Sequence, residues 1–200
     1  MTGDWFRYAL LCLALSTTAG SGLLLHGGVD QVNELVSDAV RSRSGAVLLA
    51  LAACGLAGAG VWLCAGARRG LPRTRRLVAL LAVWVVSLIA VAFFPTNLPG
   101  TPLTAAGVVH RYAAAAAVGL PPLVALLVAE KSGQRARLLR TVGFATLAAC
   151  AAFAAVHGPE VLLGSSRPPY AGLAERLLLA LVLLATGLSA WVIKRAEQTR

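Results

Sequence analysis

Six long apolar runs limit what this 200-residue chain can fold into more than any other feature. The runs occupy residues 5–25, 45–67, 77–94, 104–129, 138–156 and 172–193. A helix needs about 20 mainly apolar residues to cross the hydrocarbon core of a bilayer. Short segments rich in Gly, Pro, Ser and charge separate the runs and are typical of helix ends and turns. The pattern predicts an all-α, polytopic membrane protein, in which residues 1–200 form a single domain, a bundle of six transmembrane helices.

The composition agrees with a membrane protein and excludes other classes. Hydrophobic residues make up 58% of the chain and charged residues 13%, whereas soluble domains average about 45–50% and about 25%. The net charge of +10 could suggest nucleic acid, but aromatic residues are only 6% and form no stripe with the basic ones. We therefore expect a lipid bilayer as the partner and no nucleic acid, with a homo-oligomer left open.

The loop charges predict the orientation. One side, which holds both termini and the loops after the second and fourth runs, carries thirteen cations (Arg7, Arg68, Arg69, Arg73, Arg75, Arg76, Lys131, Arg135, Arg137, Arg140, Lys194, Arg195 and Arg200) and three acids. The other side carries five arginines and five carboxylates (Arg41, Arg43, Arg111, Arg167, Arg176, Asp30, Glu34, Asp38, Glu160 and Glu175). An excess of Lys and Arg marks cytoplasmic loops, so both termini are predicted to be cytoplasmic. The rich use of Ala, Gly and Arg favours the cell (inner) membrane of a bacterium.

The sequence offers little sign of a cofactor. The four cysteines, Cys12, Cys54, Cys64 and Cys150, lie within apolar runs and form no CxxC, so we predict buried small hydrophobes. No P-loop, Rossmann glycine pattern, nucleophile elbow or HExxH motif is present. All three histidines (His26, His110 and His157) fall on the side opposite the termini, which disfavours a two-haem arrangement. We expect neither a cofactor nor a metal.

Two runs carry features that affect helix packing. The second run has a face of small residues (Ala52, Gly55, Ala57, Gly58, Ala59 and Gly60), which lets helix backbones approach closely. The fourth run contains Pro121 and Pro122 at its middle. Each proline removes a backbone donor and crowds the preceding turn, so a structural kink is expected there.

His110 and Arg111 are the most unusual ionisable pair, because they lie within the fourth apolar run. An ionisable group inside the bilayer is costly unless it is paired or faces a cavity, which makes it a functional candidate. In the alternative interpretation the helix begins later, near Val108, and Arg111 then binds lipid phosphate at headgroup level.

The loop after the first run places carboxylates at every fourth residue: Asp30, Glu34 and Asp38. If helical, this segment is amphipathic and presents an acidic stripe to solvent. A metal site that combines the stripe with His26 is an alternative. On the same side, Glu175 suits the positive end of the sixth helix, and we consider Arg111 as its partner and Arg176 as the partner of Asp38.

Three short motifs resemble one known family. Residues 33–38 (NELVSD) resemble its N-x-x-(V/I)-S-(E/D) segment, and residues 94–97 (FPTN) with 107–110 (GVVH) resemble its F-P-x-D…G-x-x-H segment. Residues 172–176 (GLAER) resemble its G-L-x-(E/Q)-R entry to the last helix. The family is the bacterial six-helix membrane group known as domain of unknown function 998. The resemblance implies the fold and no activity. Asn97 stands where an acid is usual, and Asp38 replaces the commoner Glu.

The motif residues and their neighbours form the predicted site. Asn33, Ser37, Asp38, Asn97, His110, Arg111, Glu175 and Arg176 are expected to converge at the extracytoplasmic side. The leading hypothesis is a site that binds, senses or helps to move an amphiphilic or lipid-like ligand. One alternative is an intramembrane lipid hydrolase or transferase, metal-dependent or not, with His110, Ser37, Asp38 and His157 as catalytic candidates. The other is a structural or assembly subunit of a membrane complex, and the sequence does not decide whether the protein is an enzyme.

The topology can be tested with reporter fusions. Alkaline phosphatase fused within residues 68–76 is expected to be inactive, since that loop is predicted to stay in the cytoplasm, and a fusion after residue 167 is expected to be active. An active fusion within residues 68–76 would contradict the orientation.

Overall fold

The chain folds into six long helices. The computed structural model describes residues 4–25, 30–97, 101–163 and 166–199, apart from the side chains of residues 134, 135 and 161–163. The helices are α1 (Asp4–Leu25), α2 (Arg43–Gly70), α3 (Arg75–Phe93), α4 (Ala105–Ser132), α5 (Arg137–Leu163) and α6 (Ala171–Gln198), with short 3₁₀ helices η1 (Val36–Arg41) and η2 (Gly133–Ala136). All six long helices are long and apolar enough to span a membrane, and the described residues contain no strand. The predicted all-α, six-helix fold is confirmed, and the chain is a multi-pass membrane protein.

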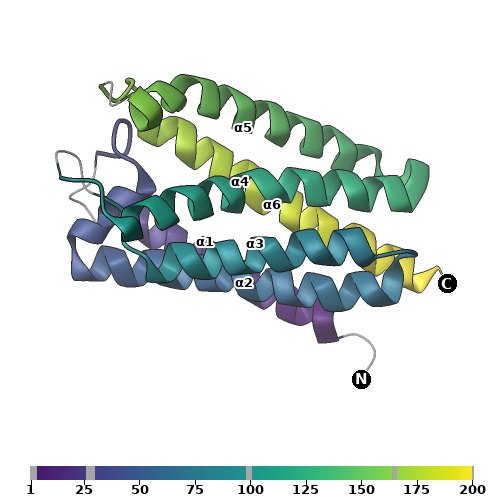
Figure 1. Cartoon of the computed structure of the whole chain (residues 1–200). Helices are drawn as coiled ribbons and strands as arrows, with labels where there is room; N and C mark the ends of the chain where they lie inside the picture. Colours follow the sequence, from purple (N-terminus) through teal and green to yellow (C-terminus); the bar gives the residue numbers. More distant parts are fainter. Residues whose placement is uncertain (1–3, 26–29, 98–100, 164–165, 200) are drawn as a thin grey trace.

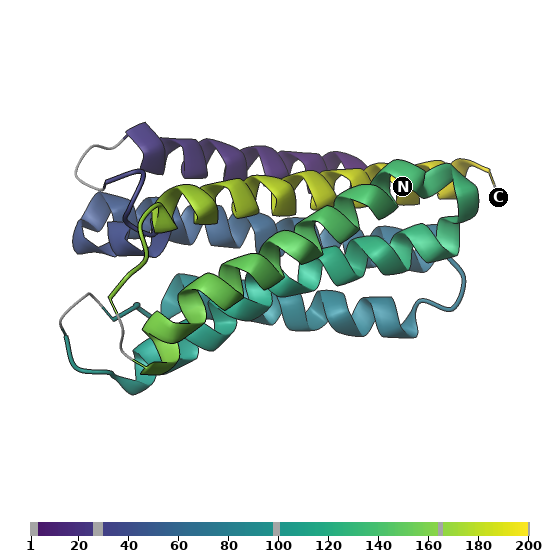
Figure 2. The same cartoon turned by 90° about the horizontal axis from the view of Figure 1, so that it is seen from above.

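The helices run alongside one another, so the links between them gather at two ends (Figure 1). Both termini lie at one end, together with the α2–α3 and α4–α5 links, and we call this the basic end. The opposite end holds residues 30–42, 94–97, 101–104 and 166–170, and we call it the loop end. α5 lies at one edge of the bundle, where it packs on α4 and α6 (Figures 1 and 2).

The observed helices extend beyond the apolar runs that predicted them. α5 continues to Leu163, seven residues past the predicted end at 156, and α6 continues to Gln198, five residues past 193. Apolar content marks only the part of a helix that suits hydrocarbon, whereas the backbone hydrogen bonds continue into polar residues. At the other ends, Ser42 and Thr104 cap α2 and α4, because their hydroxyls accept the N–H groups of Gly45 (3.0 Å) and Gly107 (3.1 Å).

α4 continues without a break through Pro121 and Pro122. A proline lacks the N–H that would reach the carbonyl four residues earlier, so the carbonyls of Ala117 and Val118 lose their helical donors. Two other helices replace these donors. The indole Nε1 of Trp84 on α3 donates to the Ala117 oxygen at 2.9 Å, and the Cys150 thiol on α5 donates to the Val118 oxygen at 3.3 Å.

This replacement joins three helices at the middle of α4. Lipid tails offer no hydrogen bonds, so a carbonyl freed by a proline must find a donor inside the protein. The proline pair therefore directs α3 and α5 to either side of α4. Trp84, which is only 1% exposed, also contributes one of the largest buried side chains of the core.

The cysteine prediction is partly correct. All four cysteines are free thiols, and Cys150 is half-buried as a hydrogen-bond donor. The prediction of burial was wrong for Cys54, which lies on the exposed surface of α2. An apolar run in a bilayer can turn any face outward, so hydrophobic surroundings in the sequence do not imply burial in the protein.

The small-residue face of α2 allows close packing against two neighbouring helices, α1 and α3. A Cβ on Gly55 would lie 2.9 Å from the Cys12 backbone oxygen on α1, and one on Gly60 would lie 3.1 Å from the Trp84 ring on α3. The absence of side chains thus brings α2 against both helices. At the basic end, the indole of Trp5 donates to the Glu197 carboxylate at 3.1 Å and ties α1 to α6.

The role of Trp84 can be measured with a double-mutant cycle. Trp84→Phe leaves the Ala117 carbonyl without a donor and should lower the free energy of unfolding in mixed micelles by about 1–3 kcal/mol. In a Pro121→Ala background the restored N–H at position 121 can donate to the Ala117 carbonyl. Trp84→Phe should then lower the free energy of unfolding by less than half as much.

Trp62→Phe is the matched control, because the Trp62 indole packs against the core and stacks on Tyr8 but makes no hydrogen bond with the described residues. An equal cost of Trp84→Phe in both backgrounds would show that the indole does not replace the missing proline donor.

Candidate functional site

The amphipathic α-helix that was considered for the segment after α1 does not form, because residues 31–33 form a turn and residues 36–41 form the 3₁₀ helix η1. The Asp30 carboxylate accepts hydrogen bonds from the backbone N–H groups of Val32 (2.9 Å) and Asn33 (3.2 Å) and from the Asn33 amide (2.8 Å). An Asp side chain that captures nearby N–H groups competes with helix formation. The prediction failed because four-residue spacing does not reveal this local competition. His26, the other half of the proposed metal stripe, lies outside the described residues.

The same hydrogen bonds fix the charge of the turn. The bond from the Asn33 amide, followed by those from the two backbone N–H groups, lowers the pKa of Asp30 below its usual value. The Arg41 guanidinium, 2.5 Å from Glu34, and the N–H of Asp30 lower the pKa of Glu34. Both carboxyls therefore stay ionised in mildly acidic solution.

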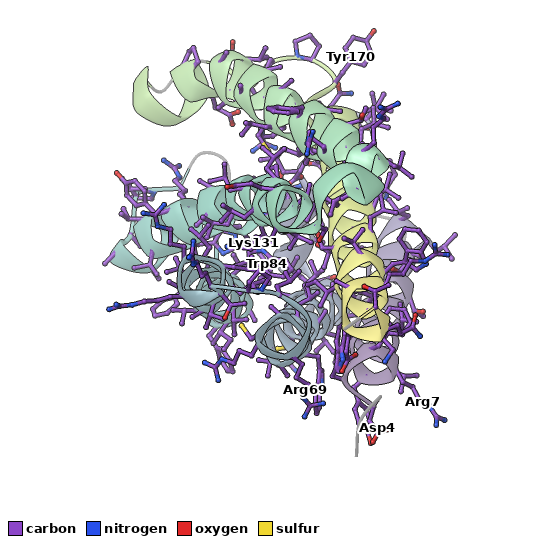
Figure 3. The ribbon with its side chains drawn as sticks, turned by 90° about the vertical axis from the view of Figure 1, so that its right-hand side faces the viewer. Asp4, Arg7, Arg69, Trp84, Lys131 and Tyr170 are labelled. Atoms are coloured by element: carbon purple, nitrogen blue, oxygen red, sulfur yellow. The ribbon has the colours of Figure 1, made fainter. Side chains whose placement is uncertain are left out.

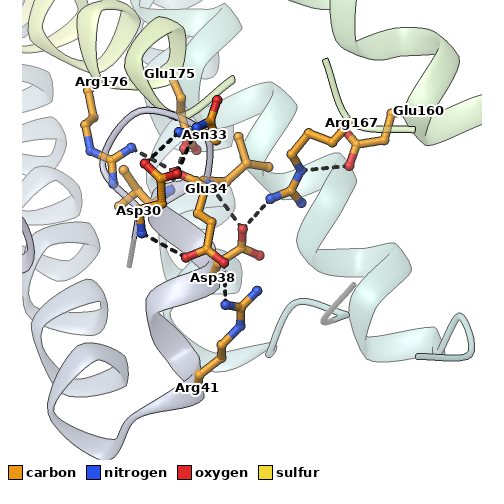
Figure 4. Close-up of polar contacts among 11 residues, drawn as sticks. Asp30, Asn33, Glu34, Asp38, Arg41, Glu160, Arg167, Glu175 and Arg176 are labelled. Carbon is orange, nitrogen blue, oxygen red and sulfur yellow. Dashed lines mark hydrogen bonds and ion pairs between the residues drawn. The ribbon is translucent and has the colours of Figure 1, made fainter. Parts of the chain in front are cut away.

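Asp38 is the most deeply buried charge at the loop end, with a side chain only 2% exposed. One of its oxygens accepts from the Leu35 N–H (3.0 Å) and from Arg167 (2.5 Å), which follows α5. Arg167 also donates to Glu160 of α5 at 3.0 Å (Figure 4). Asp38 thus pairs with Arg167, and the expectation that Arg176 would be its partner was wrong.

Arg167 therefore fastens η1 to the α5–α6 link. Burial by itself would lower the pKa of Arg167, but its hydrogen bonds to Asp38 and Glu160 outweigh burial and raise the pKa. The guanidinium stays charged and serves two carboxylates from different segments. Fork-shaped donors of this kind favour fixed, directional ion pairs.

The first turn of α6 docks onto residues 32–36 through backbone hydrogen bonds. The N–H of Leu173 donates to the Val32 oxygen at 3.0 Å, and the N–H of Tyr170 donates to the Asn33 side chain at 3.0 Å. Tyr170 adopts a left-handed conformation (φ 64°), which costs energy in a residue with a Cβ. The bond to Asn33 helps to hold that conformation.

Three residues of the GLAER motif complete this docking (Figure 4). The Glu175 carboxylate accepts from the N–H of Val36 at 2.6 Å, and the Arg176 guanidinium donates to the backbone carbonyl oxygen of Glu34 at 2.9 Å. A Cβ on Gly172 would overlap that same oxygen, so only glycine allows this approach. Residues 30–41 and the start of α6 form one interlocked unit, which we call the loop latch.

The second motif, FPTN with GVVH, forms a separate unit, the α3–α4 turn. The Asn97 oxygen accepts from the N–H (3.2 Å) and the hydroxyl (3.2 Å) of Thr104, and its amide donates to the Pro102 carbonyl. His110 is buried, and its Nδ1 lies 2.7 Å from the Phe94 oxygen. A Cβ on Gly107 would overlap Asn97. Asn97 uses both ends of its amide here, whereas an ionised acid could only accept.

Few polar groups at the loop end are left without a partner. The buried Nε2 of His157 and Nε of Arg176 make no hydrogen bond, although His157 Nδ1 bonds to the Phe153 oxygen at 3.0 Å. Arg111 is exposed on α4 and makes no hydrogen bond or ion pair with the described residues. The expected Glu175–Arg111 pair is therefore wrong.

Seven of the eight predicted site residues divide between two units, and Arg111 belongs to neither. The loop latch includes Asn33, Ser37, Asp38, Glu175 and Arg176, and the α3–α4 turn includes Asn97 and His110. Within the part of the chain that the structure describes, no hydrogen bond joins the two units. Their convergence on one ligand remains a prediction.

The comparison with known proteins agrees with the motifs. The sequence pattern of the family described as "Protein of unknown function (DUF998)" matches residues 9–192. The chain belongs to this family. No curated protein and no solved structure matches the chain.

The geometry now explains the family motifs of this chain. The first and third motifs, far apart in sequence, hold each other in the loop latch, and the second closes its own turn. Sequence reasoning missed Arg167 and Glu160 as partners of the latch. The sequence signal for this pair was weak, since Asp38 was placed in a stripe facing solvent and Arg167 is simply the one arginine of the α5–α6 link.

Removing Arg167 tests the latch. Arg167→Gln leaves the buried Asp38 carboxylate unpaired and is expected to lower the free energy of unfolding by about 3 kcal/mol, as for other broken buried ion pairs. Hydrogen exchange of residues 30–41 should rise in the same variant. Arg43→Gln at the same end is the control, because Arg43 is exposed and makes no ion pair within the part of the chain that the structure describes. Equal stability of both variants would refute the structural role of the Asp38–Arg167 pair.

Proposed function

We propose that this membrane protein binds an amphiphilic, lipid-like molecule at its loop end and senses it or helps to move it. The observation that carries the proposal is Arg111, an exposed guanidinium on an apolar helix that has no acidic partner among the described residues. Arginine is charged at any physiological pH and binds phosphate or carboxylate through two parallel hydrogen bonds. An amphiphile with such a headgroup would satisfy it.

The position of Arg111 suits a lipid headgroup. It lies six residues after the start of α4 at Ala105, about 9 Å along the helix axis. Its neighbour Tyr112 is 74% exposed, and tyrosine is enriched at the boundary between lipid and water. A long arginine side chain can reach from that depth to headgroup level while its methylene groups cover apolar surface.

Two further polar atoms at this end favour a ligand. The buried Nε of Arg176 and Nε2 of His157 have no hydrogen-bond partner among the described residues, and an unpaired buried polar group is costly. Arg176 Nε is a donor, whereas His157 Nε2 accepts in the neutral ring, because Nδ1 donates to the Phe153 oxygen. A bound molecule that offers an acceptor to the first and a donor to the second would remove part of that cost. The positive-inside rule, applied to the basic end, places the loop end on the extracytoplasmic side of a bacterial cell membrane.

A structural or assembly role is the second candidate. Most motif residues already have partners in the loop latch and the α3–α4 turn, as that role requires. α5 also offers a surface for another subunit or a second copy, because only 17% of its apolar, membrane-spanning stretch is buried against the rest of the protein. The hydrolase alternative lacks such support, since the Ser37 hydroxyl makes no hydrogen bond with His110 or His157, and the described residues hold no group of three potential metal ligands.

Native mass spectrometry of protein purified in mild detergent tests the ligand proposal. Arg111→Gln is expected to reduce the occupancy of a co-purified amphiphile about tenfold or more, the effect of losing one charge-assisted hydrogen bond. Arg111 is preferable to His110 for this test, because His110 holds the α3–α4 turn.

Arg43→Gln is again the control, since it removes an exposed arginine from the same end that has no ion-pair partner among the described residues. If Arg111→Gln and the wild type retain the same molecules at the same occupancy, the role of Arg111 is refuted and the assembly role is favoured.

A further inference from the structure

The basic end contains a cavity of about 750 Å³ that none of the motifs reaches. It lies between the α2–α3 link and the ends of α4 and α6, and its lining includes Leu71, Lys131, Ser132, Trp191 and Arg195. A volume of this size is in the usual range for small-molecule sites, about 300–1,000 Å³. The cavity and the loop end are at opposite ends of the bundle.

The charges of the cavity are all of one sign. Lys131 and Arg195 line it, and no Asp or Glu is among its lining residues. The nearby Glu197 is occupied elsewhere, by Lys194 (3.0 Å) and by the Trp5 indole. Two cations without a counter-charge favour an anionic occupant.

Hydrogen-bonding capacity is also left over. Lys131 uses one of its three N–H donors on the Arg73 carbonyl at 3.1 Å, which fixes its ammonium beside the α2–α3 link. The Ser132 hydroxyl is buried and has no partner in the described structure. Arg195 stacks over the Trp191 ring at 4.1 Å, and its guanidinium makes no hydrogen bond with the described residues. These groups form an incomplete set of donors, suited to the oxygens of a phosphate.

The remaining walls indicate that the phosphate belongs to a lipid. Leu71 and Val192 are buried apolar residues that line the cavity, and they can contact glycerol and the first carbons of acyl chains. Trp191 is 42% exposed, as is typical of tryptophan at a membrane interface. Basic pockets between helix ends at this level bind the headgroups of anionic lipids.

We infer that this cavity binds the phosphate headgroup of an anionic phospholipid from the leaflet at the basic end. Lys131, Arg195 and Ser132 contact the phosphate, and the apolar wall contacts the glycerol and acyl carbons. The site does not depend on the ligand proposed for the loop end.

The test uses the full chain in neutral detergent, with added dioleoylphosphatidylglycerol counted by native mass spectrometry. The double variant Lys131→Gln/Arg195→Gln should weaken lipid binding about tenfold or more, since it removes both charged donors. The control Arg7→Gln/Arg69→Gln removes two charges from the same end without touching the cavity, because both side chains point away from the bundle (Figure 3). It should change binding less than about threefold, as expected for screened surface charges.

Two other probes identify the source of the phosphate. Dioleoylphosphatidylcholine, whose headgroup also carries a cation, should bind more weakly than dioleoylphosphatidylglycerol. Inorganic phosphate in millimolar excess should not displace the lipid. Displacement by phosphate would overturn the lipid assignment in favour of a free anion, and equal binding of the two lipids would overturn the charge argument.

Folding and the second site are controlled separately. Arg195→Gln alone is the fallback if the double variant is unstable, because the Arg195 guanidinium stacks on the Trp191 ring and makes no hydrogen bond or ion pair with the described residues, and it should weaken binding about fivefold to tenfold. The cavity substitutions should remove the same fraction of bound lipid in the Arg111→Gln background as in the wild type. That result distinguishes this site from the one proposed at the loop end. Undiminished lipid binding in a folded cavity variant would refute the inference.

Discussion

The architecture of this bundle depends on the two backbone carbonyls that Pro121 and Pro122 leave without donors. Inside a bilayer such groups must be satisfied by protein, and here they bond to an indole on α3 and a thiol on α5. Because both donors are fixed in space, α4 has one position and one rotation relative to its two neighbours. The rest of α4, including His110 at one end and Lys131 at the other, is placed by this central constraint.

The two ends of the bundle differ in how their charged side chains are arranged. At the loop end, carboxylates and arginines pair closely, and Asp38 and Arg167 connect segments 129 residues apart in sequence. At the basic end, cations outnumber acids and are left partly unpaired around a cavity. A closed network favours a fixed scaffold, whereas unpaired cations favour binding of an anion. The distribution of charge therefore agrees with a scaffolding role for the loop latch, and with the ligand sites that we propose at Arg111 and in the basic cavity.

The family motifs acquire a physical meaning in this arrangement. Gly172 and Gly107 are glycines because a Cβ would overlap a backbone oxygen or Asn97. Asn97 replaces the usual acid and still closes its turn, because its amide donates to Pro102 and accepts from Thr104. The motif residues at these positions shape the chain, and the groups available to a ligand lie next to them.

The sequence by itself determined the six membrane-spanning helices, the grouping of cations at one end and the small-residue face of α2. These features follow from local apolar length and composition, which a single chain displays without knowledge of its partners in space. Only the tertiary structure decided that Arg167 pairs with Asp38, that Trp84 and Cys150 serve the proline-freed carbonyls, and that Lys131 and Arg195 share a cavity. Each of these contacts joins residues distant in sequence, and its partner is selected by helix rotation and close packing, which local patterns do not encode.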